Sequence, residues 1–371
     1  DYAFTGALSA VLGRPWPGGL KIDFEAGNYA KRKDLRHKNK RLDFEVAPSI
    51  LYRFGQGAIG AAYLFGKNSE RVEAEEIGTS ADSYLAFFDK GLAYGILERW
   101  DGSGIHLNET GISGFPIKEL THGASLQGAC GPCYVDVTYR YRHGESGERD
   151  TFMHDFTTHQ VTARGVATLP ANHAFHTVRA RFDWKTQEND EAILRRETID
   201  GIATVIDLGS LPIYARRSLE TGIEYELQTR RIDLRAGAAY EQSTRRSTLL
   251  YPYVREQELH VWSGFARIRV LCKQWEFSGN ADFRKGGFSE NAFETADTPL
   301  ETGPYPTQLT EYYDYTNEYL TAPRLGVGLG IRRNIHRFYI DLSARYEHGF
   351  QLTFIPQVYR TTVLLSVGYN F

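Results

Sequence analysis

The C-terminal stretch Gln357–Phe371 decides the fold class and reads QVYRTTVLLSVGYNF. Apolar and aromatic side chains occupy alternate positions, and most of the residues between them are polar. The apolar face holds Tyr359, Thr361, Val363, Leu365, Val367, Tyr369 and Phe371. Because successive side chains of a strand point to opposite faces, this period of two predicts a half-buried β-strand.

The same alternation recurs along the chain. In Arg41–Phe54, apolar residues such as Leu42 and Phe44 alternate with charged ones, and Cys133–Arg142 repeats the pattern. Many of these segments run for about 10 to 14 residues, whereas strands of soluble proteins average roughly 5 to 6. A tilted strand of this length can cross a bilayer. The pattern therefore favours membrane-crossing strands over the alternative of a soluble sandwich or propeller.

Composition narrows the class of protein further. The 371 residues include 23 Tyr, 21 Phe and 36 Gly but a single Met, which suits pleated strands better than helices. No run approaches the roughly 18 to 20 apolar residues of a membrane-spanning helix, so a helical membrane protein is excluded. A formal net charge of −3 implies no polyanion partner, and we expect no nucleic-acid binding.

The predicted connections alternate between short and long. Short ones are expected at Pro15–Gly19, Gly55–Gly57, Pro170–His173, Gln228–Arg231, Lys273–Gln274 and Arg332–His336. Long polar ones are expected at Lys31–Lys40, Arg142–Asp155, Lys185–Arg216, Glu241–Glu256, Lys285–Asn317 and His348–Pro356. Short periplasmic turns and long extracellular loops are typical of outer-membrane barrels.

The final residues Leu364–Phe371, reading LLSVGYNF, resemble the C-terminal strand of bacterial outer-membrane β-barrels. In that class the terminal Phe is read by the barrel-assembly machinery. The resemblance implies an integral protein of the cell outer membrane, surrounded by lipid and lipopolysaccharide, with Tyr369 and Phe371 as its assembly signal. The rest of the chain looks like the uncharacterised outer-membrane barrel families. The resemblance implies no substrate.

We therefore expect an all-β fold: one transmembrane antiparallel up-and-down β-barrel domain over residues 1–371, with about sixteen strands and fourteen or eighteen as alternatives. Residues 67–119 are predicted to form a long external excursion, or an extra hairpin that turns at Asp101–Gly104. Residues 285–320 are predicted to form a long extracellular loop. An even strand number requires either a strand before Asp1 or a first segment outside the barrel. The chain starts without Met or a leader, so we expect it to be processed or to lack its true start.

Charged residues on the predicted inward faces are the most informative polar set. In a water-filled barrel they tune selectivity, and with mixed signs they equally well compensate one another. The predicted lumen-lining residues are Arg41, Asp43, Glu45, Arg140, Arg179, Arg181, Glu224, Glu226, Arg235, Asp341 and Arg345.

Two small motifs contain residue types that occur in redox and metal sites. Cys130-Gly131-Pro132-Cys133 has the letters of a redox motif, but an alternating strand follows it instead of a helix. A turn with a small disulfide between Cys130 and Cys133, or with two free thiols, fits better. His154, Asp155 and His159 lie close in sequence, but they lack metal-site spacing and a solvated loop fits them better.

The segment from Glu294 to Pro323 concentrates tyrosines, among them Tyr305, Tyr312, Tyr313, Tyr315 and Tyr319. They predict either a binding platform or a strand extension with an interfacial aromatic belt. No cofactor, no metal and no enzymatic activity are expected from the sequence.

Two functions from different classes remain. The first is a channel for small polar solutes through a charged lumen. The second is an occluded accessory or structural barrel that docks a larger uptake, secretion or assembly complex, with another outer-membrane protein or a lipoprotein as partner. A barrel of about sixteen strands is wide enough to conduct unless its loops fill it, so the channel is the first choice.

The resemblance of the last strand generates a test. Replacing Phe371 with Ala is expected to lower the amount of protein inserted into the outer membrane far more than deleting any single loop. Insertion can be measured by fractionating membranes and resolving folded from unfolded protein on gels. Equal insertion of Phe371→Ala and the wild-type chain would remove the assembly-signal argument.

Overall fold

The computed structural model describes most of the chain. The described residues are 2–13, 15–30, 36–75, 84–100, 115–148, 152–248, 254–293 and 307–369.

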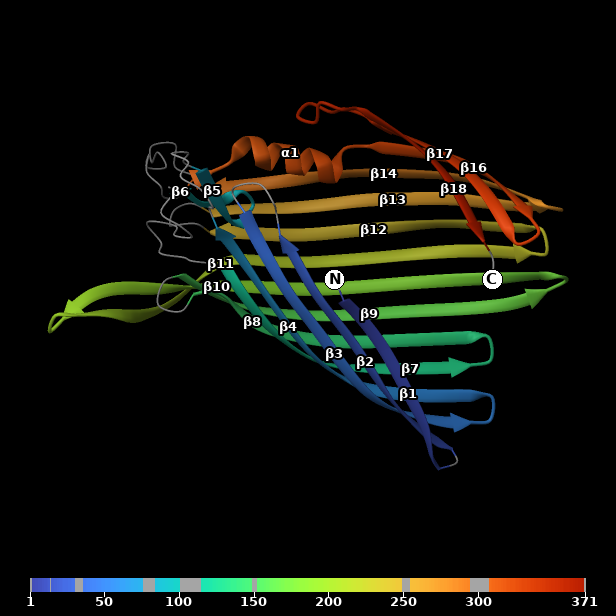
Figure 1. The fold of residues 1–371 in the computed structure, drawn as a ribbon, viewed down its shortest axis with the longest axis horizontal. Helices are drawn as coiled ribbons and strands as arrows, with labels where there is room; N and C mark the ends of the chain where they lie inside the picture. The colour runs from blue at the N-terminus through green and yellow to red at the C-terminus, as the bar shows by residue number, and fades with distance from the viewer. Residues whose placement is uncertain are drawn as a thin grey trace.

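Within these ranges, fifteen strands form the main sheet, and each neighbouring pair is antiparallel. In sheet order they are β1 (Tyr2–Gly13), β2 (Trp16–Ala30), β3 (Arg36–Phe54), β4 (Gly57–Glu75), β7 (Phe115–Cys130), β8 (Cys133–Glu148), β9 (Phe152–Ala171), β10 (Ala174–Ile199), β11 (Ile202–Thr229), β12 (Ile232–Thr248), β13 (Val254–Cys272), β14 (Trp275–Phe293), β16 (Arg324–Ile335), β17 (Phe338–Gly349) and β18 (Tyr359–Tyr369). The sheet is strongly twisted, so the first strands are inclined to the middle ones (Figure 1). The predicted all-β, antiparallel up-and-down barrel fold is confirmed, with a strand number close to the expected one.

A second, small sheet is separate from the main one. It consists of β15 (Thr307–Gln308), β6 (Tyr94–Trp100) and β5 (Tyr84–Gly91), in that order. Helix α1 (Thr310–Thr321) follows β15 directly and runs alongside β14 (Figure 1). Within the described ranges, no helix is both long and apolar enough to span a membrane.

The two faces of the main sheet have opposite chemistry. Arg140 on β8 lies 3.7 Å from Glu45 on β3, although β4 and β7 separate these strands. Side chains of strands that are separated by two others can meet only on the inside of the sheet's curve, so this charged face is the inner face. On the outer face, large apolar side chains remain exposed from the first strand to the last, for example Leu8, Leu126, Ile223, Leu329 and Val367. An apolar surface of this extent favours contact with lipid over contact with water.

Most strands of the main sheet contact only their neighbouring strands, so their side chains form no apolar core. The closely packed region is instead at one end of the inner face, where Leu259 and Val261 of β13 are buried together with Tyr94 and Tyr313. Helix α1 and the β5–β6 hairpin contribute the two tyrosines, so these two elements cover that end of the sheet.

Connections at the opposite end are short, as the sequence predicts. Two-residue turns join β3 to β4, β7 to β8, β9 to β10, β11 to β12, β13 to β14 and β16 to β17. We call this the short-turn end, and the other the long-loop end.

Several predicted long loops are wrong. Strands β8 and β9 extend into Arg142–Asp155, and the whole of Lys185–Arg216 is strand except for the turn at Asp200–Gly201. The β10–β11 hairpin projects beyond the rest of the sheet as a two-stranded ribbon (Figure 1). Both faces of such a ribbon meet water, so its side chains need not alternate between apolar and polar even though its backbone stays paired. The alternation of apolar and polar residues that predicts strands elsewhere in the chain is therefore missing in this ribbon.

The two predicted insertions also need correction. Within residues 67–119, β4 continues to Glu75 and the hairpin turns at Leu92–Ala93, while Asp101–Gly104 lie outside the described residues. Within residues 285–320, the first part continues β14 as far as Phe293, and the last part is helix α1. The first segment of the chain pairs with β2, so the alternative that placed it outside the sheet is wrong.

The opposite faces of β7 provide a matched test. Leu126 is 62% exposed on the outer face, and its neighbour Gln127 points to the inner face. In lipid, Leu126→Arg is expected to lower the free energy of unfolding by about 1 to 4 kcal/mol, because an arginine then faces hydrocarbon. Gln127→Arg should change it by less than about 1 kcal/mol. Urea unfolding in lipid vesicles measures both, and equal losses would mean that the outer face does not meet lipid.

Candidate functional site

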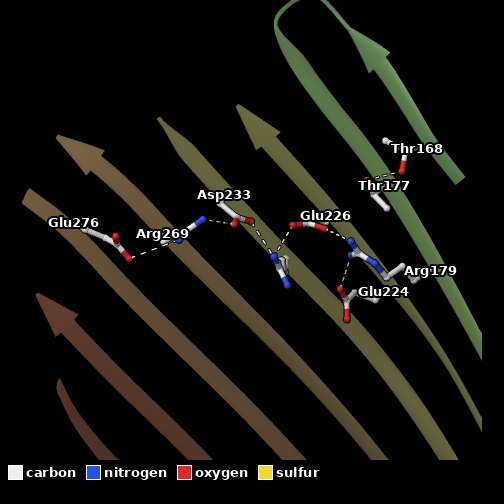
Figure 2. Close-up of polar contacts among 9 residues, drawn as sticks. Thr168, Thr177, Arg179, Glu224, Glu226, Asp233, Arg269 and Glu276 are labelled. Carbon is white, nitrogen blue, oxygen red and sulfur yellow. Dashed lines mark hydrogen bonds and ion pairs between the residues drawn. The ribbon is translucent and has the colours of Figure 1, made fainter. Parts of the chain in front are cut away.

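Near the short-turn end, the inner face carries a row of charged side chains across strands β10 to β14. We call Arg179, Glu224, Glu226, Asp233, Arg235, Arg269 and Glu276 the charge ladder (Figure 2). Glu226 on β11 is at its centre, with only 5% of its surface exposed. Its carboxylate lies 2.5 Å from Nη2 of Arg179 and 2.8 Å from Nη2 of Arg235.

The ladder continues in both directions with alternating sign. Nη1 of Arg179 lies 2.8 Å from Glu224. On the other side, Asp233 accepts from Nη2 of Arg269 at 3.1 Å and lies 3.5 Å from Nε of Arg235. Each charge therefore has a partner of opposite sign, and the ladder is internally compensated. In such a network the ion pairs offset the cost of removing the charges from water, and the contacts link five strands.

All the predicted lumen-lining residues lie on the inner face. The structure brings Arg179, Glu224, Glu226 and Arg235 together in the ladder and gives the others separate partners. The separate pairs are Arg41 with Asp43, Arg140 with Glu45, Arg181 with Glu220, Asp341 with Arg332, and Arg345 with Asp282. That these residues line a solute path stays a prediction.

The long-loop end of the inner face is covered by helix α1 and the β5–β6 hairpin. Arg255 on β13 joins the two: its guanidinium lies 4.5 Å from the Tyr94 ring centroid and 4.2 Å from that of Tyr313. The same group donates to the carbonyl of Leu92 at 3.1 Å and lies 2.9 Å from Glu290. Stacking of a guanidinium between two aromatic rings, with an ion pair behind it, makes a strong local attachment.

Gln257 is the second attachment of the helix. It is 1% exposed, and its Nε2 donates to the Tyr313 hydroxyl at 3.0 Å and to Oδ1 of Asn317 at 2.7 Å. Burial raises the pKa of Tyr313 to about 12, so this hydroxyl stays protonated throughout the physiological range.

The hairpin is attached separately to β10 and β11. Nζ of Lys90 lies 2.7 Å from both carboxylate oxygens of Glu191. Burial lowers the pKa of Lys90, although Glu191 opposes this effect. Gly91 follows with φ +127°, and a Cβ there would collide with the ring of Tyr214. A glycine is therefore required where the hairpin meets the sheet.

Glu318 ties helix α1 to the β17–β18 connection. Its carboxylate accepts hydrogen bonds from the backbone N–H groups of Thr353, Phe354 and Ile355, at 2.6 to 3.1 Å. Burial by itself would raise the pKa of Glu318, but these three donors lower it below its usual value. The helix is thus fixed at both the sheet and the last connection.

The tyrosine-rich segment is a helix, contrary to the predicted strand extension. Tyr312, Tyr313, Tyr315 and Tyr319 all lie on α1, and only Tyr313 is buried. Tyr305 lies outside the described residues.

The remaining sequence candidates do not assemble into a site. His154 is buried on the inner face, whereas His159 is exposed and pairs with Tyr139 on the outer face at 2.8 Å. Cys130 and Cys133 face each other across the turn of β7 and β8, and both are free and exposed, which is the second of the two alternatives left open by the sequence. Cys272 is also free and exposed.

Tyr369 ends β18, and its ring packs on Phe338 with centroids 5.0 Å apart. Phe371 lies outside the described residues, so its role in assembly stays a prediction.

Sequence comparison places the whole chain in one family. Residues 1–371 match a family described as a family of unknown function, DUF6850. The chain belongs to this family. Among curated proteins, none matches the DUF6850 chain.

Several solved outer-membrane proteins are similar to the DUF6850 chain in fold. The ferric preacinetobactin receptor BauA of Acinetobacter baumannii has 9% identity and a TM-score of 0.48, over 99% of this chain and 57% of the receptor. The siderophore receptor PiuA of the same organism has 9% identity and a TM-score of 0.41, over 94% of this chain and 62% of the receptor. OmpT of Vibrio cholerae has 11% identity and a TM-score of 0.30, over 89% of this chain and 88% of OmpT. The chain spans less than two thirds of the length of the two receptors, and likenesses this distant assign it no activity.

The ladder of the DUF6850 chain generates a prediction. Glu226→Gln removes the carboxylate that two arginines share, and should lower the free energy of unfolding by about 1 to 3 kcal/mol. Glu224→Gln is the matched control and should cost less than about 1 kcal/mol, because Arg179 keeps Glu226. Urea unfolding of the two variants in vesicles compares them. Equal costs would contradict the central position of Glu226.

Proposed function

We propose that this DUF6850 chain is an integral outer-membrane β-barrel protein that passes small polar solutes along its charged inner face. Helix α1 and the β5–β6 hairpin narrow its outer mouth. The single observation that carries the proposal is the contrast between the exposed apolar outer face and the charged inner face of one continuous sheet.

The contrast suits a bilayer on one side and water on the other. An outer face lined with residues such as Leu126 and Ile223 gains free energy by leaving water for hydrocarbon. An inner face with ion pairs such as Arg140–Glu45 needs polar surroundings, and fixed charges there select among solutes. In this arrangement the short turns lie in the periplasm and the long connections lie outside.

The proposed surroundings follow from the same arrangement. Lipid and lipopolysaccharide contact the outer face, and the barrel-assembly machinery handles the chain through its last strand. The proposal includes no enzymatic activity.

A second candidate is favoured by a specific observation. The contacts of Arg255 and Gln257 with the helix and the hairpin are buried, so the cover is packed and is not a loose loop. If the cover seals the mouth, the chain is an occluded accessory subunit whose outer face or loops dock another outer-membrane protein or a lipoprotein.

Conductance separates the two candidates. Purified full-length protein in planar bilayers should conduct weakly, and replacing residues 76–114 with a short Gly-Ser linker should raise its conductance several-fold, because the cover loses its hairpin. Removing residues 194–207 from the β10–β11 ribbon is the matched control, since this segment forms the end of the ribbon that projects beyond the rest of the sheet (Figure 1). It should leave the conductance unchanged.

Two results would overturn the solute path. One is silence of both the full-length protein and the hairpin deletion, with folding verified by heat-dependent gel mobility. The other is an equal rise for the ribbon deletion, which would assign the current to general damage. Silence of this kind would leave the accessory role as the better account.

A further inference from the structure

A second charged row crosses the inner face beneath the cover, toward the long-loop end. Direct cross-strand partners link β8 to β13 in one line. In order they are Arg142, Thr158, Gln187, Arg216, Arg245 and Gln257. Lys185 lies on the same face of β10, two residues from Gln187. We call Arg142, Lys185, Arg216 and Arg245 the cation row.

The cation row differs from the charge ladder in one decisive way. Among the described residues, none of its four members has an ion pair with a carboxylate. Arg216 and Arg245 are moreover direct partners on neighbouring strands, where like charges repel each other. The ladder shows that this sheet can alternate signs across the same strands. In the row, by contrast, Glu119, Asp183 and Glu241 attract Lys185 and Arg245 without forming an ion pair with them.

Three of the carboxylates near the row hold other groups. Glu191 binds Lys90 of the hairpin, and Glu290 binds Arg255. Asp183 accepts a hydrogen bond from Gln160 at 2.8 Å. These contacts hold the cover and the sheet together, so the acids cannot turn to the arginines without releasing them.

A cavity opens where the row meets the cover. Its volume is about 380 Å³, and it is an open pocket bordered by the hairpin at Asp89–Ala93, by helix α1, and by Gln187, Tyr214 and Arg245 of the sheet. This size is at the lower end of the range for small-molecule sites. Two members of the row's cross-strand line, Gln187 and Arg245, thus form part of its wall.

Unused hydrogen-bond donors gather around this cavity. Asn317, which lines it, is 2% exposed, and its Oδ1 is taken by Gln257 while its Nδ2 has no partner. The Nε atom of Arg245, which lines the cavity, is also buried without a partner, and so is that of Arg216, its cross-strand partner behind the wall. A buried donor without an acceptor is costly, and such groups call for an explanation. A ligand with several acceptor oxygens and a negative charge would satisfy the donors and relieve the repulsion at once.

We propose that this cavity and the adjoining cation row form a binding site for a small anionic ligand that carries a phosphate, sulfate or carboxylate group. Arg245 meets the anion from the cavity wall, and its cross-strand partner Arg216 adds positive charge beside it. Asn317 donates to the anion from the helix, and the rings of Tyr214 and Tyr312 border the rest of the ligand. The site deepens the proposed function by naming the solute class, and it rests on the inner face being the side that solutes reach.

Titration calorimetry on the purified full-length protein in detergent at low salt tests the site. The probes are glucose 6-phosphate and glucuronate, with glucose as the neutral match. Both anions should bind at least tenfold more tightly than glucose, and added salt should weaken them. The double variant Arg216→Gln/Arg245→Gln should lose at least tenfold in affinity for the anions.

Two further variants separate recognition from folding. Arg164→Gln removes an arginine of the inner face at the short-turn end, where it lines a different cavity, and should change the affinity by less than twofold. Arg216→Lys/Arg245→Lys keeps both charges and should retain most of the binding. Without ligand, the double Gln variant should melt at or above the wild-type temperature, because a repulsion has gone; a purely structural role predicts a lower melting temperature.

The proposal is overturned if glucose binds as tightly as the anions, if Arg164→Gln loses as much affinity as the double variant, or if no anion binds at millimolar concentration. Binding without conductance in bilayers would instead overturn the solute path and leave the site standing. Conductance without anion binding would overturn the anion site and leave the solute path standing.

Discussion

Antiparallel backbone pairing is the constraint on which the rest of this structure depends. In hydrocarbon no water satisfies a free N–H or C=O group, so a chain that meets lipid must pair its main chain with itself. Once each strand pairs with its neighbours, its side chains alternate between the two faces. The apolar outer face and the charged inner face are consequences of this one arrangement. Inner charges are tolerable because most of them are paired, as Arg179 and Arg235 are through Glu226.

The two charged rows of the inner face differ in charge pattern and in position. The ladder alternates in sign and holds strands β10 to β14 in register near the short-turn end. The cation row has one sign and lies under the cover, beside a cavity whose other walls come from the hairpin and the helix. Charges are therefore paired where the strands are held together, and cations lack ion pairs where the cavity lies. This division is what we expect of a sheet that supports the proposed site.

Sequence reasoning reached the architecture but only part of the candidate site. Alternation in segments such as Cys133–Arg142 predicts where strands lie, which side chains point outward and where the short turns fall, because each residue there meets either lipid or the interior. It failed in Lys185–Arg216, where a water-exposed ribbon gives no contrast between faces. The cation row was missed for this reason: Arg142, Lys185 and Arg216 border segments that the polar composition marked as loops. The hairpin turn at Leu92–Ala93 has no turn-forming residues, so sequence chemistry pointed to Asp101–Gly104 instead.

The attachment of the cover has a consequence for the order of folding. Arg255 reaches back across 163 residues of chain to the carbonyl of Leu92, and Lys90 binds Glu191 across 101 residues. Contacts between such distant parts of the chain cost the most loop-closure entropy, so they form after local pairing has brought their supports together. Neighbouring strands of the main sheet can therefore pair one after another before the β5–β6 hairpin and helix α1 have a surface to pack on. The mouth is open during assembly and is covered last, which leaves the interior accessible to water for as long as its charges are still finding partners.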